Sequence, residues 1–433
     1  MSEIPGRLIT YCSNIHPGEG WAETFTALRQ HIPAVKAAVS PNHAFPIGLR
    51  LSHRAAVELS PEENRRFTDW LRENDCFVPT LNGFPYGSFH GERVKEKVYL
   101  PDWRSPQRAA YTMRLADLLA GWLPEGMAGS ISTVPIGIKG GGSDGDPGAV
   151  RQQILAVLTH LQALRRERGA RIVLALEPEP GCLLETTEEV CDFFAALELP
   201  PDVRDLLGVC YDCCHQAVEF EEPADSLARL AAAGVPIAKV QISSALRLLA
   251  PAAQALRGCE TIGTSDSIRH SGVSRNPGRT ADIDEDNRID ELDPGIRRGD
   301  ERPNRAVMNF SQALRNFDEP CYLHQVVVRN RSGDLSRYQD LPEAIERHPV
   351  EAGEEWRCHF HVPIFVAQAG AHGTTRAFLE EILPLLPPEL LLEVETYTWE
   401  VLPAELRNGS VTASIIRELQ WLGAQLDAPH GCS

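Results

Sequence analysis

Three acidic side chains stand at the ends of apolar, strand-like segments. Glu177 ends "VLALE", Asp212 ends "LLGVCYD" and Glu395 ends "LLLEVE". An isolated carboxylate in apolar surroundings is costly, so acids in such places are either paired with Lys or Arg or bind a metal ion. We favour the metal, since carboxylate oxygens that meet at one end of a sheet suit a divalent ion, and such a carboxylate could also move a proton.

Histidines offer a second set of ligands. His215 follows Asp212 in "DCCH", and His359 and His361 alternate with apolar residues in "CHFHVPIF". Residues two apart on an extended segment point the same way, so both imidazoles can face one ion. The preferred ligands are Glu177, Asp212, Glu395 and His361, with Gln241, His215 and His359 as second choices, and Zn, Mn or Mg as the metal.

Three cysteines close to Asp212 raise the alternative of a thiolate zinc cage. On a strand, Cys210 and Cys213 point to opposite faces, and no second Cys pair stands at a fixed spacing elsewhere. We therefore interpret Cys210, Cys213 and Cys214 as small apolar packing residues, and Asp212 with His215 as the chemically important pair.

Eight apolar segments that alternate with helical patterns would position these groups. Helix starts lie between them, as where Ser60 is followed by Pro61 and Glu63. Eight parallel strands close a TIM barrel, whose active sites lie at the carboxyl ends of the strands. We predict an α/β protein with a (β/α)8 barrel and an extended insertion between strands seven and eight. The strand segments are 7–14, 46–52, 76–83, 129–137, 171–180, 206–214, 237–244 and 390–399.

One segment departs from this pattern. Residues 257–309 contain no aromatic residue and are dominated by Gly, Arg, Asp and Ser. We predict a disordered, repeat-derived insertion at 258–304 within a single domain that spans 1–433. Its acidic run at 282–293 matches a calcium loop only in part, because Asn287 stands where the loop needs glycine, and we expect no calcium site there.

Polar residues near the ends of the predicted strands could bind a substrate. Asn14 and His16 end the first strand, and Asn82 and His90 lie at and after the end of the third. His324, in "CYLHQVVV", is a further candidate.

Composition limits the classes of partner. The formal net charge of −18 disfavours nucleic acid, because phosphate backbones need concentrated Lys and Arg. We read no signal peptide and no apolar run of membrane-spanning length. The eleven cysteines form no disulfide framework, so we expect a cytoplasmic protein without membrane insertion.

Several motifs resemble the xylose isomerase-like barrels, a superfamily of sugar epimerases, inosose dehydratases and endonuclease IV-type enzymes. "YDCCHQAVEF" resembles their D-x-x-H segment after strand six, and "LALEPEP" and "LEVETYTW" resemble their metal-binding glutamate segments. "CHFHVP" is similar to paired ligands of the endonuclease branch. The chain departs from the pattern at Gln241, a position usually held by histidine.

Longer stretches, including "NGFPYGSFHGERVKEKVYLPDWR" and "EVETYTWEVLP", resemble the bacterial family called metabolite traffic protein EboE. This resemblance covers nearly the whole chain. It implies a role in the traffic or maturation of a secondary metabolite, alongside a UbiA-like membrane prenyltransferase.

We therefore expect a divalent-metal-dependent protein that acts on a small polyol-like or phosphorylated metabolite by isomerisation, epimerisation or dehydration. Glu177, Glu395 and His215 are the candidates for proton transfer. Two alternatives stay open: a metal-dependent phosphoesterase, and a non-catalytic protein that binds and hands over a metabolite.

Overall fold

The computed structural model describes residues 7–91, 93–141, 146–250, 305–369 and 372–428. Eight parallel strands form one sheet in the order β1-β14-β7-β6-β5-β4-β3-β2. A parallel bridge between Cys12 and Gly48 links the first and last strands of this order, so the sheet is a nearly closed barrel. The barrel strands are β1 (Ile9–Tyr11), β2 (Phe45–Arg50), β3 (Cys76–Asn82), β4 (Gly129–Thr133), β5 (Ile172–Leu176), β6 (Leu207–Asp212), β7 (Ile237–Ile242) and β14 (Leu392–Val394).

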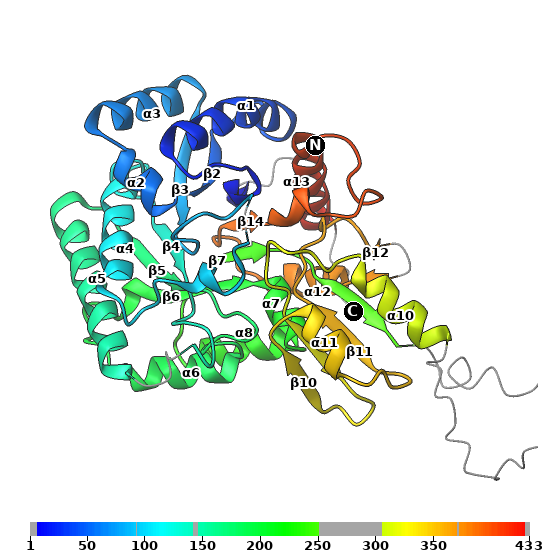
Figure 1. Cartoon of the computed structure of the whole chain (residues 1–433). Helices are drawn as coiled ribbons and strands as arrows, with labels where there is room; N and C mark the ends of the chain where they lie inside the picture. The colour runs from blue at the N-terminus through cyan, green and yellow to red at the C-terminus, as the bar shows by residue number, and fades with distance from the viewer. Residues whose placement is uncertain (1–6, 92, 142–145, 251–304, 370–371, 429–433) are drawn as a thin grey trace, which may run out of the picture.

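Each of the eight predicted segments overlaps one barrel strand, so the predicted fold class is confirmed. Helices lie between the strands and cover the outside of the barrel (Figure 1). The predicted cap of α3 is present, because the Ser60 side chain accepts a hydrogen bond from the Glu63 amide. The helices of the barrel are α1 (Trp21–Val39), α2 (His53–Glu58), α3 (Pro61–Glu73), α4 (Pro106–Leu119), α5 (Pro147–Arg168), α6 (Thr187–Ala196), α7 (Cys213–Val218), α8 (Pro223–Ala232), α12 (Arg376–Ile382) and α13 (Val411–Asp427).

The insertion between β7 and β14 contains a second sheet beside the barrel (Figure 1). Its strands run antiparallel in the order β10-β9-β11-β8-β13-β12. With α10 and α11 it has its own apolar cluster around the fully buried Trp356 and Phe360. The predicted segment 258–304 and its partial calcium loop lie outside the described residues. The elements are β8 (Leu246–Leu249), α10 (Arg305–Arg315), β9 (Val326–Arg329), β10 (Leu335–Tyr338), α11 (Leu341–Arg347), β11 (Glu355–Cys358), β12 (Gln368–Ala369) and β13 (His372–Thr374).

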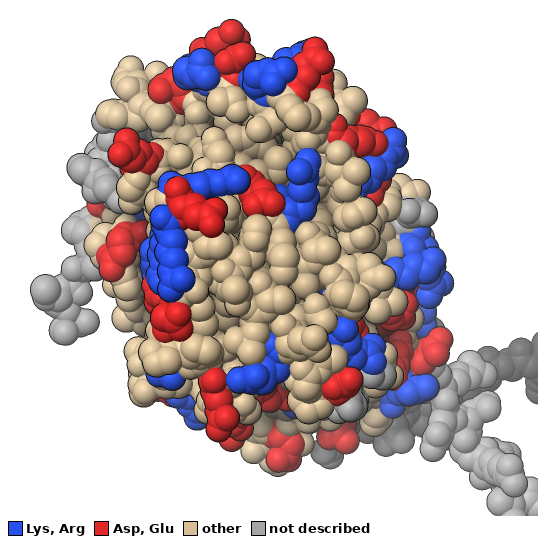
Figure 2. Space-filling view, turned by 90° about the vertical axis from the view of Figure 1, so that its left-hand side faces the viewer, with Lys and Arg blue, Asp and Glu red and all other residues tan. Residues whose placement is uncertain are grey.

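Charged side chains of both signs lie next to one another on the face shown in Figure 2, with uncharged stretches between them. The net negative charge is therefore not gathered into one acidic region on this face. Among the described helices, none is long and apolar enough to cross a membrane.

Candidate metal centre

Three strands deliver the predicted carboxylates to one place. Asp212 is the last residue of β6, while Glu177 directly follows β5 and Glu395 directly follows β14. One oxygen from each carboxylate lies within 4.8 Å of the other two, and all three side chains are buried. Asp212 Oδ2 has no hydrogen-bond partner. Buried, clustered carboxylate oxygens with an open position are a donor set that fits a divalent cation.

This crowding of acids perturbs their protonation. Burial raises the pKa of Glu177 to about 7, and the Asp212 carboxylate adds to the rise. Burial, followed by repulsion from Glu177, also raises the pKa of Glu395 well above its usual value. Without a cation the group therefore holds protons near neutral pH, and a bound cation would replace them.

The histidines converge beside the carboxylates. His359 Nε2 lies 3.1 Å from His215 Nε2 and 3.3 Å from His361 Nε2. The Nδ1 atoms donate to oxygen acceptors, namely Pro178 O for His215, Gln325 Oε1 for His359 and Glu395 O for His361.

Because the Nδ1 atoms carry these protons, the Nε2 atoms of neutral rings present only lone pairs to one another. Such contacts are repulsive unless a proton or a metal ion lies between them. Two imidazoles bound to one zinc ion at about 2.0–2.1 Å would have their nitrogens roughly 3.0–3.4 Å apart. The observed separations fit that arrangement.

Asp212 and His215 connect the carboxylate group and the histidine group. Asp212 Oδ1 accepts hydrogen bonds from the His215 amide at 3.0 Å and from the Ser243 hydroxyl at 2.7 Å, which leaves Oδ2 turned to the site. Burial alone would raise the pKa of Asp212, but His215 and His361 outweigh it and hold that pKa below its usual range. Asp212 is therefore the most readily ionised acid of the group.

Glu179 is a site residue that the sequence interpretation missed. Its Oε1 accepts hydrogen bonds from Tyr99 Oη at 2.7 Å and Gln325 Nε2 at 3.2 Å, while Oε2 has no partner and the side chain lines the pocket. The signal was available, because Glu179 stands two residues after Glu177 in "EPEP" and so shares its face. Tyr99 and Gln325 carried no such signal.

A buried ion pair fills the barrel interior. Lys239, on β7, donates from Nζ to Glu393 Oε2 at 2.5 Å and to Asn82 Oδ1 at 2.6 Å. Gln241 Nε2 also donates to Asn82 Oδ1, at 3.1 Å, and Gln241 does not line the pocket. Neutralisation by lysine, the alternative to metal binding, therefore applies directly to Glu393 rather than to the three clustered carboxylates.

The predicted substrate-binding residues separate into two sets. Asn14 and Asn82 line the pocket, and Asn14 Nδ2 donates to Glu395 Oε1 at 2.7 Å. The three histidines do not line it and have other partners. His16 contacts the Tyr11 hydroxyl, His90 the Tyr322 hydroxyl, and His324 both Glu319 and the His359 carbonyl.

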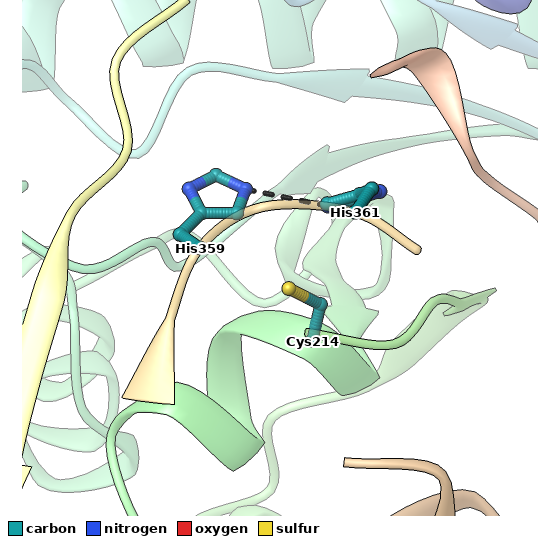
Figure 3. A group of neighbouring side chains, drawn as sticks. All are labelled: Cys214, His359 and His361. Atoms are coloured by element: carbon teal, nitrogen blue, oxygen red, sulfur yellow. Dashed lines mark hydrogen bonds between the residues drawn. The ribbon is translucent and has the colours of Figure 1, made fainter. Parts of the chain in front are cut away.

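The cysteines near Asp212 differ in their surroundings. Cys213 packs in the main apolar core, as the sequence interpretation expected. Cys214 differs, because its Sγ lies within 4.8 Å of ligand nitrogens of His359 and His361 as well as against an apolar cluster (Figure 3). Cys210 and Cys213 belong to no cluster of three or more potential metal ligands among the described residues.

Comparisons with known proteins find only distant structural similarities. No protein-family model and no curated protein matches the chain, so membership of the EboE family stays a prediction. One similar solved structure is a xylose isomerase-like TIM barrel protein from Mycobacterium smegmatis in complex with magnesium, at 12% identity over 98% of this chain and all of that one, with a TM-score of 0.45.

Two shorter similar structures are a D-tagatose 3-epimerase-like protein and the IolI protein with a bound zinc atom, both 14% identical. The first covers 54% of this chain and 75% of its own, with a TM-score of 0.36. The second covers 51% and 67%, with a TM-score of 0.33. The reaction therefore has to be inferred from the site itself.

Proposed function

We propose that this chain is a divalent-metal-dependent enzyme that transfers a proton on a small, polyol-like metabolite, in the manner of a sugar isomerase, epimerase or dehydratase. The observation that carries the proposal is the convergence of Glu177, Asp212 and Glu395 with the histidine group at the carboxyl end of the barrel. This is the end at which TIM barrels place their active sites.

The clustered residues have separable roles. Glu177, Asp212 and Glu395 would hold the ion, with His215, His359 and His361 beside it, and the ion would polarise a carbonyl or hydroxyl oxygen of the substrate. Asn14 fixes the Glu395 carboxylate by its hydrogen bond. Gln325 fixes the ring of His359.

Glu177 is our choice for the group that moves the proton. Glu177 lines the pocket, and a carboxylate that a bound cation has freed of its proton can accept one from the substrate. Glu395 also lines the pocket and is the second choice. His215 also lines the pocket and can accept or return a proton.

The pocket walls favour an uncharged substrate. Among the described residues that line the pocket, Lys95 is the only Lys or Arg, and it forms an ion pair with Asp340. Phe89, Tyr322 and Tyr397 also line the pocket, and their rings contact one another. Aromatic faces pack against the C–H face of a polyol or against an apolar part of a metabolite.

A metal-dependent phosphoesterase is the second candidate. Two adjoining donor groups that share Asp212 offer places for two ions, as in two-metal phosphate-transfer sites. The absence of an unpaired Lys or Arg among the described pocket residues is unfavourable for a phosphate ester.

The proposal also includes a biological role for the chain. A role in the maturation or traffic of a secondary metabolite, next to a UbiA-like membrane prenyltransferase, rests on the EboE resemblance. If the site binds metal and metabolite without turnover, the non-catalytic traffic protein is the function that remains.

The proposal can be tested without knowing the natural substrate. Metal-loaded protein is incubated in D₂O with a panel of ketoses, inososes and polyols, and deuterium incorporation at carbon is followed by NMR. We expect exchange with at least one compound and a loss of 10²-fold or more, an order-of-magnitude figure for a general base, in Glu177→Gln. Exchange that persists unchanged in Glu177→Gln would contradict the assignment of Glu177.

A further inference from the structure

The thiol of Cys214 lies beside two of the candidate metal ligands. Its Sγ and the ligand nitrogens of His359 and His361 are all within 4.8 Å of one another. Figure 3 shows the sulfur pointing from α7 toward the segment that carries the two histidines. Cys214 is fully buried.

Apolar packing explains only one side of this thiol. Cys214 contacts a small cluster with Val218, Ala245 and Val327, which would suit a neutral S–H group. Packing does not account for the two imidazoles on the other side. Their Nδ1 protons are held by oxygen acceptors, so their Nε2 lone pairs are free to bind an ion.

An independent observation indicates that this space takes a cation. Asp212 Oδ2, in a fully buried side chain, has no hydrogen-bond partner. One carboxylate oxygen of Asp212 also lies within 4.8 Å of a ligand nitrogen of His361. A buried carboxylate oxygen without a donor is costly, and a cation beside the imidazoles would satisfy it.

The two donor groups differ in chemical character. Glu177, Asp212 and Glu395 offer only oxygen, which suits Mg²⁺ or Mn²⁺. Imidazole nitrogen and thiolate sulfur together suit Zn²⁺, which binds both in proteins. Neighbouring positions with such different donors would select different metals.

We propose that Cys214 is a thiolate ligand, together with His359 and His361, of a zinc ion next to the carboxylate group. When zinc binds, the S–H bond of Cys214 is replaced by a Zn–S bond and the proton is released to solvent. Because Cys214 belongs to α7 and the two histidines follow β11 of the inserted sheet, the ion would join the insertion to the barrel. The proposal rests on the proposed function only in requiring that the site binds divalent metal.

X-ray absorption at the zinc edge of the purified full-length protein tests this directly. We expect one sulfur neighbour at about 2.3 Å besides nitrogen or oxygen at about 2.0–2.1 Å. Cobalt substitution provides a second readout, since thiolate ligation gives Co²⁺ a charge-transfer band in the near ultraviolet. The sulfur signal and the band should disappear in Cys214→Ala and persist in Cys213→Ala, a control at an adjacent, equally buried position.

The outcomes are distinct. Zinc bound by nitrogen and oxygen alone overturns the role of Cys214 and leaves the proposed function intact. A sulfur signal that survives in Cys214→Ala also overturns it. Failure of the full-length protein to bind any divalent metal overturns both proposals. Should Cys214→Ala not fold, the absorption spectrum of the unaltered protein still decides whether sulfur is a ligand.

Discussion

The Nε2 atoms of His359 and His361 lie 3.3 Å apart, while the Nδ1 atom of each ring donates to an oxygen. Two neutral imidazoles gain nothing from this contact, since both nitrogens present lone pairs. Burial lowers the pKa of His361 to about 4 and that of His359 well below its usual value, so a proton between these two rings does not resolve the conflict near neutral pH. A bound metal ion does.

Removal of the metal should make stability depend on pH. Burial and the neighbouring acids raise the pKa of Glu177 to about 7 and that of Glu395 well above its usual value in the folded chain. A raised carboxyl pKa gives stability that is present below the unfolded pKa and is lost as pH rises through the folded value.

The metal-free protein should therefore lose roughly 2 kcal/mol or more between pH 4.5 and pH 8. Urea unfolding across this range, with and without bound metal, measures the effect. The metal-loaded protein should show a flatter dependence near neutral pH, and equal slopes for the two forms would argue against metal binding by these acids.

Gln325 should support the metal site from outside it. Its side-chain oxygen accepts the His359 Nδ1 proton and its nitrogen donates to Glu179, so Gln325→Leu frees both groups. We expect a 10–100-fold weaker metal affinity, the order found for residues that orient ligands, by competition with a chelating dye. Gln162→Leu alters a buried glutamine that bonds to Asp202, away from the site, and should leave the affinity unchanged.

Lys239 should be needed for the stability of the folded protein. Lys239→Met leaves the buried Glu393 carboxylate without its cation, which costs about 3–5 kcal/mol in comparable buried pairs. Adding Glu393→Gln should recover part of that loss, because the second change removes the unpaired charge. Equilibrium unfolding of the single and double variants checks this, and additive losses would contradict a direct pairing.

Glu418, which is not a candidate metal ligand, should also make stability depend on pH. Burial raises its pKa to about 7, against its hydrogen bonds from the Thr396 hydroxyl and the Ile364 amide. The charged form of Glu418 therefore destabilises the folded protein above neutral pH. Glu418→Gln should be about 2 kcal/mol more stable than the unaltered protein at pH 8 and equally stable at pH 4.5. Glu405→Gln, at an exposed position, is the control, and parallel stability profiles for Glu418→Gln and the unaltered protein would refute the effect.

The parts of the site that the sequence predicted are those set by local patterns. Glu177, Asp212 and Glu395 stand at ends of apolar strands, and parallel strands of a barrel bring such ends together whatever the details of packing. His359 and His361 followed from their alternation with apolar residues. The eight strands were found for the same reason, as each is a compact apolar run between helical patterns.

The remaining parts depend on contacts between distant segments. Gln325 meets Glu179 across 146 positions in the chain, and neither residue type nor spacing signals that meeting. His90 and His324 likewise look like pocket residues from their sequence, but hydrogen bonds to Tyr322 and Glu319 hold them outside the pocket. The pairing of the inserted sheet, in which β11 lies between β9 and β8, also has no local signature.

The central claim is that the cluster at the end of the barrel binds divalent metal. Elemental analysis of the protein, dialysed against metal-free buffer and then reloaded, should find at least one divalent ion per chain. Asp212→Asn changes the residue common to the Glu177–Asp212–Glu395 group and the Asp212–His215–His361 group, and should retain less metal than the unaltered protein. Asp205→Asn, in a surface ion pair, should retain as much as the unaltered protein. No retained metal in the unaltered protein, or equal retention in Asp212→Asn, would contradict the account.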